Sequence, residues 1–214
     1  DESGIAQELA TGFPVIESVT VDAGIWGTVV VDIVERNALA LWCDSGSNCY
    51  KMDSDGFIFD PFPYESPEQL NDYVVFKGMI DQARAEGVTG QKFLTAKEIS
   101  AFLDTKKILK KTNKDVEYIR CESQALCLIK IVQNGVLRVD PATDLANAFD
   151  RLNSALSAPV FAKNTFEYID LRFGNKLFYR LSNGEVGGDA TSTAKTKANG
   201  TPKIGTSTDE STIR

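Results

Sequence analysis

The sequence contains no histidine among its 214 residues. Histidine is the side chain that most often acts as a general base at neutral pH, and it is the commonest nitrogen ligand for metal ions. Catalysis by a Ser-His-Asp or Cys-His arrangement within this chain is therefore excluded. We predict neither a cofactor nor a metal site.

Long apolar runs are also missing. A helix that spans a bilayer needs about 20 consecutive apolar residues, and the most apolar stretch, residues 28–34, is interrupted by Asp32. The first residues, Asp1, Glu2 and Ser3, have neither the positive charge nor the apolar core of a targeting signal. Two interpretations follow. Either the protein is soluble as made, or the sequence is a piece from downstream of a membrane anchor.

Basic residues are in the minority, with 23 Lys and Arg against 30 Asp and Glu and a net charge of −7. A protein that follows a nucleic-acid backbone needs a basic face that displaces counterions, so nucleic acid is not an expected partner. The chain is 43% hydrophobic. That content and length are enough to bury a core in one large or two small domains.

Four cysteines form two pairs with the same spacing, Cys43 with Cys49 and Cys121 with Cys127. Each pair lies in a segment with the pattern of strand, short polar turn and strand, which places the two side chains opposite each other where a bridge can form. Two local disulfides are typical of an oxidising, extracytoplasmic compartment. Reduced core cysteines are the second interpretation. A zinc site is the third, although five intervening residues exceed the usual zinc spacing.

The N-terminal part has the pattern of a helix followed by two antiparallel strands. Ile5, Leu9 and Phe13 recur at helical spacing, and a proline follows that ends a helix. Residues 15–22 alternate between apolar and polar side chains, and residues 28–35 are rich in β-branched side chains. This pattern is half of a small α/β unit.

The following part is rich in strands and contains two predicted helices. Thr95 and Glu98 form a capping-box pattern at the start of a helix over residues 95–110, and a helix over residues 142–156 carries an apolar stripe. Strands are predicted over residues 40–42, 50–52, 57–59, 74–77, 116–121, 127–132, 136–139, 166–173 and 176–181. After Asn183 the composition of Gly, Ser, Thr, Ala and Lys predicts a disordered tail.

Few motifs point to chemistry. Asp53-x-Asp55-Gly56 resembles part of a calcium-binding loop but lacks the remaining ligands, so a hairpin turn explains it better. A carboxylate pair such as Asp140 with Asp144 does acid–base work only in a shared pocket, which nothing in the sequence indicates. An enzyme is therefore not expected.

Two stretches taken together resemble a known family. The first comprises FPVIESVTV at residues 13–21, VVVDIVERNALALW at residues 29–42, and the segments CYKMD and GFIF that follow. The second is YIDLRF at residues 168–173. Their order and spacing are similar to the end of the POTRA domain and the β domain of the bacterial cell-division family FtsQ/DivIB. Asn37 stands where that family often has proline, and the first POTRA strand and helix and the transmembrane helix are absent from this sequence.

The resemblance implies a single-pass protein of the cell membrane whose extracytoplasmic part binds other division proteins, notably the coiled-coil proteins FtsB and FtsL. In that family a strand of the partner is added to the terminal strands of the β domain. The sequence adds that residues 176–181 form the last strand before the predicted tail, so this strand is expected at a sheet edge with unpaired backbone groups. The predicted partner-binding residues are Phe173, Asn175, Lys176, Leu177, Phe178, Tyr179, Arg180 and Leu181.

The sequence thus predicts an α+β fold. It consists of a partial POTRA-like unit over residues 1–36, a mainly antiparallel β domain with two helices over residues 37–183, and the tail over residues 184–214. Backbone pairing is expected to supply affinity, and Phe173 and Tyr179 to supply specificity. A charge or a proline at Leu177 is then expected to abolish partner binding without unfolding the domain.

Other interpretations stay open. A different POTRA-type assembly or translocation module would bind through residues 28–36. An envelope hydrolase without histidine would need two carboxylates with raised pKa values in one pocket. Arg172 either contacts a partner or pairs with Asp170 or Glu167 within the fold.

Overall fold

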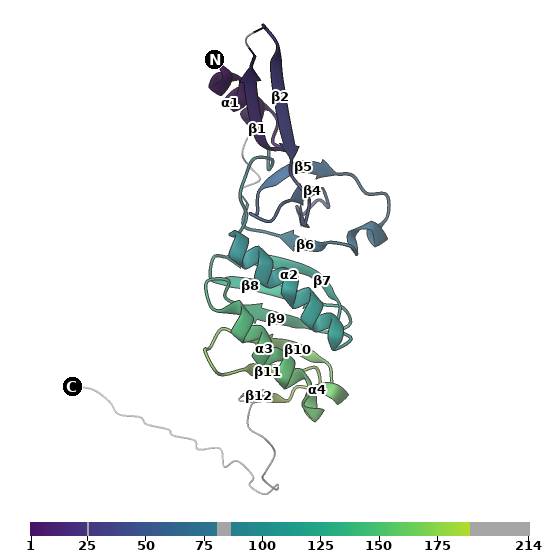
Figure 1. Cartoon of the computed structure of the whole chain (residues 1–214). Helices are drawn as coiled ribbons and strands as arrows, with labels where there is room; N and C mark the ends of the chain where they lie inside the picture. The colour runs from purple at the N-terminus through teal and green to yellow at the C-terminus, as the bar shows by residue number, and fades with distance from the viewer. Residues whose placement is uncertain (25, 81–86, 189–214) are drawn as a thin grey trace, which may run out of the picture.

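The computed structural model describes residues 1–24, 26–80 and 87–188 (Figure 1). The molecule is elongated, with a narrow N-terminal hairpin at one end and a large sheet whose strands succeed one another toward the other end. Most of the predicted tail, residues 189–214, lies outside the described residues. The fold is α+β, as predicted.

The N-terminal unit consists of helix α1 (Glu2–Gly12) and the antiparallel strands β1 (Ile16–Ala23) and β2 (Val29–Glu35). The helix ends before Pro14, and α1 lies against β1 rather than β2. The predicted helix and strand pair are confirmed. Because α1 leaves β2 uncovered, every residue of β2 is exposed.

The first half of the large sheet contains β3 (Ala40–Cys43), β4 (Cys49–Met52), β5 (Ile58–Phe62) and β6 (Val74–Lys77). β3, β4 and β5 form consecutive antiparallel hairpins, and β6 returns parallel to β3 after the short 3-10 helix η1 (Pro67–Leu70). These strands match the predicted ones closely.

The second half adds six strands, which are β7 (Val116–Ser123), β8 (Leu126–Ile131), β9 (Val136–Val139), β10 (Phe166–Asp170), β11 (Phe178–Leu181) and β12 (Val186–Gly188). The order across the ten-stranded sheet is β12-β11-β10-β9-β8-β7-β6-β3-β4-β5. Three neighbouring pairs are parallel, β3 with β6, β6 with β7 and β9 with β10, and the others are antiparallel. The predicted mainly antiparallel domain is therefore confirmed.

Helices α2 (Ala96–Lys111), α3 (Leu145–Leu156) and α4 (Pro159–Lys163) lie on one face of the sheet (Figure 1). At the start of α2, Thr95 and Glu98 form the predicted capping box. The main core lies between these helices and the sheet, and its largest fully buried side chains include Trp42, Phe76 and Phe102. Each such side chain contributes about 1.5–3 kcal/mol through its burial.

A smaller cluster lies on the opposite face, over β3, β4 and β6. Leu41 and Val75 are buried there beside one disulfide, under aromatic side chains from the segment between β5 and β6. The cover does not extend past β7. The remaining part of this face carries only side chains of the strands themselves among the described residues.

Arg36 joins the N-terminal unit to the large sheet. Its Nε donates to the Pro14 carbonyl oxygen at 3.1 Å, while Nη1 pairs with the Asp53 carboxylate. The guanidinium also lies 4.1 Å from the centre of the Phe57 ring. Asp53 Oδ1 accepts from the backbone N–H groups of Asp55 and Phe57. The Asp53 motif is thus a hairpin turn, as predicted, and the structure adds that its carboxylate pairs with Arg36.

Both predicted disulfides are present, Cys43 with Cys49 and Cys121 with Cys127. In each hairpin the bridged residues are direct cross-strand partners, with Cα atoms 4.1 and 4.0 Å apart. One bridge lies in the small cluster and the other in the main core. Because the four cysteines form these two disulfides, the interpretations as reduced thiols and as zinc ligands are wrong for this structure.

Candidate functional site

The sheet does not end at β11. Gly184 has a φ of +89° in a tight turn, after which Val186 and Gly188 pair with Arg180 and Phe178. Strand β12 therefore occupies the position next to β11, and the prediction that residues 176–181 form the edge strand is wrong. The predicted start of the tail at residue 184 is also wrong for residues 184–188.

Strand β12 escaped prediction because it has almost no apolar content. Its central residue, Gly187, lies under the Tyr179 ring, and a Cβ atom there would approach the ring to 2.5 Å. Tyr179 in turn packs edge-on against Phe161 of α4, with ring centres 4.9 Å apart. The glycine that weakens the strand pattern is thus required by an aromatic contact that the sequence does not reveal.

The backbone of β12 presents hydrogen-bonding groups at the edge. The Leu181 N–H donates to the Glu185 carbonyl at 2.8 Å. In an antiparallel pair the hydrogen-bonded positions alternate, so the polar groups of Val186 and Gly188 point away from β11. Among the described residues no further strand pairs with this edge. A strand from a partner is the natural occupant of such an edge.

Exposed apolar side chains surround the same edge. Val186 is 71% exposed, Phe173 52% and Phe178 40%, and the two phenylalanine rings contact edge-on with centres 5.2 Å apart. Asn175 and Lys176, also predicted to bind a partner, lie exposed in the turn that precedes β11. Exposed residues of this turn, β11 and β12 thus lie at one end of the sheet.

Two of the predicted contact residues lie inside the protein instead. Leu177 is 1% exposed and Leu181 is 0% exposed, and both belong to the main core. They were assigned to the partner surface because strand alternation alone does not tell which face is covered. A charge at Leu177 would therefore destabilise the domain, so the expectation that this change spares folding is wrong.

The two arginines of this region pair within the fold. Arg172 donates from Nε and Nη2 to the Asp170 carboxylate at 2.9 and 2.7 Å, and Arg180 lies 3.1 Å from Glu167. The hydrogen bonds to Asp170 raise the pKa of Arg172 above its ordinary value. The interpretation of Arg172 as an internal pair is confirmed.

The opposite edge of the sheet, at β5, is covered by the chain itself. The Ile58 N–H donates to the Gln91 carbonyl at 2.9 Å, and the Gly90 N–H donates back to the Ile58 carbonyl at 2.7 Å. Farther along β5, Pro61 has no N–H group to offer. This edge therefore offers little backbone to a partner.

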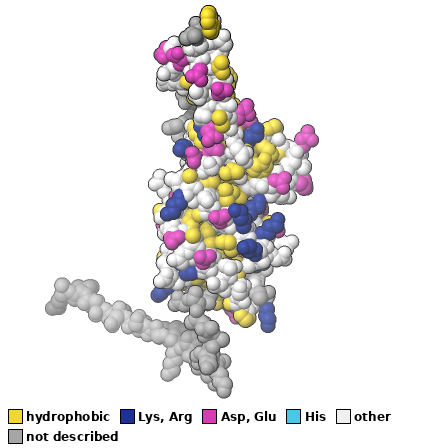
Figure 2. Space-filling view, in the orientation of Figure 1, with side chains coloured by type: hydrophobic (Ala, Val, Ile, Leu, Met, Phe, Trp, Pro, Cys, Tyr) yellow, Lys and Arg dark blue, Asp and Glu magenta, His cyan; other side chains and the backbone are white. Residues whose placement is uncertain are grey.

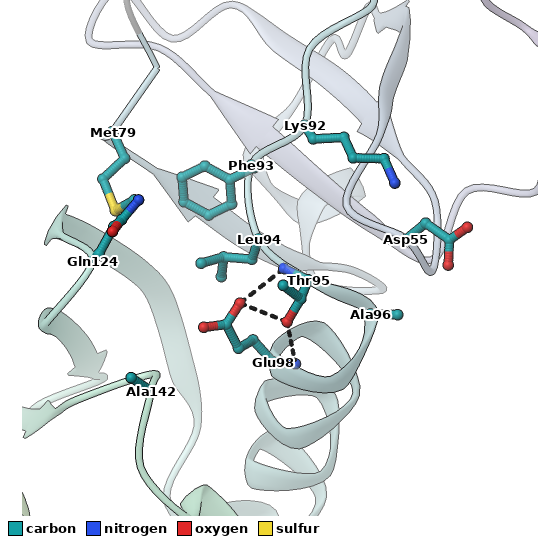
Figure 3. Close-up of a pocket in the computed structure, with 10 residues that line it drawn as sticks. All are labelled: Asp55, Met79, Lys92, Phe93, Leu94, Thr95, Ala96, Glu98, Gln124 and Ala142. Carbon is teal, nitrogen blue, oxygen red and sulfur yellow. Dashed lines mark hydrogen bonds between the residues drawn. The ribbon is translucent and has the colours of Figure 1, made fainter.

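A surface pocket of about 610 Å³ opens at the start of α2 (Figure 3). The Glu98 carboxylate in its wall is held by the N–H and hydroxyl of Thr95 at 2.8 and 2.7 Å. Figure 3 shows Asp55, on the other side, with its carboxylate directed away from Glu98. The carboxylates of Asp55 and Glu98 thus do not point toward each other, and Glu98 is already hydrogen-bonded. The hydrolase interpretation instead requires two carboxylates that face the same substrate.

Comparisons with known proteins add no family. No protein-family model matches the sequence, and no curated protein is detectably related to it. Among the described residues, no helix is both long and apolar enough to cross a membrane. The resemblance to FtsQ/DivIB therefore stays a prediction.

Proposed function

We propose that this protein is a non-enzymatic binding module that acts outside the cytoplasm. It binds a partner protein that adds one of its own strands to the sheet beside β12. The partner expected from the FtsQ/DivIB resemblance is an FtsB- or FtsL-type division protein, and the module is then a membrane-anchored scaffold for septum assembly. The observation that carries the proposal is the outer backbone of Val186 and Gly188, which no strand in the described part of the chain pairs with, beside the exposed rings of Phe173 and Phe178.

Two further observations support the proposal. At the β5 edge, residues 90–93 already pair with the chain, and Pro61 has no N–H group to donate. The other end of the sheet is therefore the better place for strand addition. The two buried disulfides are typical of proteins that fold in an oxidising compartment. Backbone pairing at β12 would supply affinity, and contact with the phenylalanine rings would supply specificity.

A pair of substitutions at Val186 tests strand addition. Val186→Pro removes the outward N–H donor, whereas Val186→Thr keeps that donor and the β-branched shape. We expect Val186→Pro to weaken binding of purified FtsB- and FtsL-type proteins from the same organism at least about five-fold, and Val186→Thr to keep it within about three-fold. The reason is that a lost backbone hydrogen bond at a desolvated interface costs about 1–3 kcal/mol. Titration calorimetry with the 214-residue chain measures both.

The outcomes separate the mechanisms. Equal losses of affinity in both variants would mean that the partner contacts the Val186 side chain and does not pair with the backbone. Unchanged binding in Val186→Pro would refute strand addition at β12. No binding by the unaltered chain would remove the division-protein assignment.

A second candidate function rests on β2. Its apolar residues are 39–55% exposed on both faces, and Trp26 at the hairpin tip is 91% exposed. Figure 2 shows hydrophobic side chains at the tip and along this hairpin. A strand with apolar residues on both faces is typical of a sheet interior, which favours a POTRA-type module that binds through residues 28–36. Ile33→Lys, at a 49% exposed site, would abolish that binding and leave binding at β12 intact.

A further inference from the structure

The sheet face opposite the helices carries an ordered array of side chains on β7 to β11. Ile119, Ile129, Leu137 and Ile169 are buried in the core on the helix side, so their neighbours along each strand face the other way. Strand register places these outward residues in two rows. The first row is Tyr118, Lys130, Val136, Tyr168 and Arg180, and the second is Arg120, Leu128, Arg138, Asp170 and Phe178.

Positive charge dominates these rows. Lys77, which is paired in register with Arg120 on the neighbouring strand, extends the second row. Within the described part of the chain, none of Lys77, Arg120, Lys130 and Arg138 forms an ion pair with a carboxylate. Yet the whole protein has a net charge of −7. The face therefore carries several cations without ion-pair partners among the described residues, although the protein as a whole is acidic.

The cations are held in place by aromatic rings. Arg138 lies 4.2 Å from the centre of the Tyr168 ring, and Lys77 and Arg120 lie 4.9 and 5.7 Å from the centre of the Tyr118 ring. Such contacts fix the side chains while leaving their charge unneutralised. The carboxylate in the second row, Asp170, is already bound by Arg172.

Apolar side chains lie between the charges. Leu128 and Val136 occupy the middle of the array, where they are only partly buried. At the Tyr118 end a pocket of about 570 Å³ opens beside η1, with Tyr73 and Lys77 in its wall. A phosphate polymer would use the cations alone, whereas a protein surface also uses the aliphatic residues and the pocket.

We propose that this surface, the basic sheet face defined by the two rows and Lys77, binds an acidic amphipathic helix of a partner protein. Backbone groups within β7 to β11 are paired with neighbouring strands, so an occupant must satisfy its own backbone hydrogen bonds. A helix does so, as α2 and α3 do on the other side of the same sheet. Five strands spaced about 4.8 Å apart span about 20 Å, which matches roughly 13 helical residues.

The basic sheet face meets the β12 edge at Phe178, but its test residues Arg120 and Arg138 lie on β7 and β9, away from that edge. Its role does not depend on strand addition. The probe is a designed helical peptide of 16 residues with Glu and Leu on one face, compared with a scrambled peptide of the same composition. Arg120→Glu with Arg138→Glu is the test variant. Its control is Lys97→Glu with Lys111→Glu, which makes the same charge change at exposed sites of α2, on the helix-covered side where Figure 2 shows basic side chains.

Binding is measured by fluorescence anisotropy with the 214-residue chain, and folding of each variant is checked through the fluorescence of buried Trp42. We expect the test variant to bind the ordered peptide at least about ten-fold more weakly and the control variant to bind within about three-fold of the unaltered chain. No binding, or equal loss in both variants, would overturn the proposal. If the scrambled peptide or polyglutamate bound equally well, the ligand would be a general polyanion and not a helix. Equal binding of phosphatidylglycerol vesicles would make the ligand a lipid surface.

Discussion

The junction at Arg36 allows a quantitative prediction. Replacing Arg36 by Met keeps most of the side chain's length but removes three contacts, which are the ion pair with Asp53, the hydrogen bond to Pro14 and the stacking on Phe57. The ion pair is largely sheltered, because the Arg36 and Asp53 side chains are 18% and 10% exposed. After the substitution, the Asp53 carboxylate keeps its two turn hydrogen bonds and loses its cation.

The expected loss of stability follows from these contacts. Arg36 makes two hydrogen bonds from its charged guanidinium, and each such bond contributes at least about 1.5 kcal/mol. The cation–π contact contributes about 0.5–1 kcal/mol. Arg36→Met is therefore expected to cost about 4 kcal/mol. Asp53→Asn keeps an acceptor for the turn and is expected to cost about 2 kcal/mol, because it loses only the charge pair.

A double-mutant cycle isolates the pair. Guanidinium chloride unfolding followed through the buried Trp42 is expected to give a coupling energy of about 2 kcal/mol between Arg36 and Asp53. Because the contacts span the two parts of the molecule, hydrogen exchange in β1 and β2 is expected to accelerate in Arg36→Met more than exchange in β8. A coupling energy below about 0.5 kcal/mol, or equal acceleration in all strands, would refute this account of the junction.

Three shorter predictions concern the large sheet and the helix α2 that packs on it. Cys121→Ala with Cys127→Ala is expected to lose about 3 kcal/mol, from the entropy of a short closed loop and the lost core packing, and a loss below 1 kcal/mol in guanidinium chloride unfolding would contradict this. Gly135→Ala is expected to lose about 3 kcal/mol or more of unfolding free energy, because its Cβ would collide with the Glu167 carbonyl oxygen. Gly12→Ala is the control, because the space around Gly12 is open. Thermal melts are expected to show almost no change in stability for this control. Burial lowers the pKa of Lys106 below its ordinary value of 10.5. Between that lowered pKa and 10.5 the unfolded state binds more protons than the folded state, so stability rises with pH. Urea unfolding at pH 8 and pH 10 is expected to show a smaller rise in stability for Lys106→Gln than for the unaltered chain.

Much of the fold was predictable because its segments carry strong local patterns. Thr95 and Glu98 mark the start of α2 through their own hydrogen bonds, which involve only neighbouring residues. The strand over Val74–Lys77 and that over Val136–Val139 were predicted with their observed bounds. The cysteine pairs were predictable for the same reason, since a short hairpin brings its two strands together without help from the rest of the chain.

The candidate binding edge was predicted only in part. Phe173 was assigned to the partner surface through the family resemblance and Phe178 through its place in the last predicted strand, and both lie exposed near the end of the sheet. Leu177 and Leu181 have a similar local pattern but face the core. The difference depends on where α3 and α4 pack, and that is not encoded within the strand. Short elements such as α4 and β12 likewise lack a pattern of their own.

The sequence by itself determined most of the secondary structure, the disulfide pairing and the absence of histidine-based chemistry, because each depends on residue type and on neighbours along the chain. Only the tertiary structure decided which strand forms the edge and which face of the sheet is open. Gly187, for example, pairs with Tyr179 in β12 at a place where the Tyr179 ring leaves no room for a larger residue. The basic sheet face exists only because five strands bring cations that are distant in the sequence side by side.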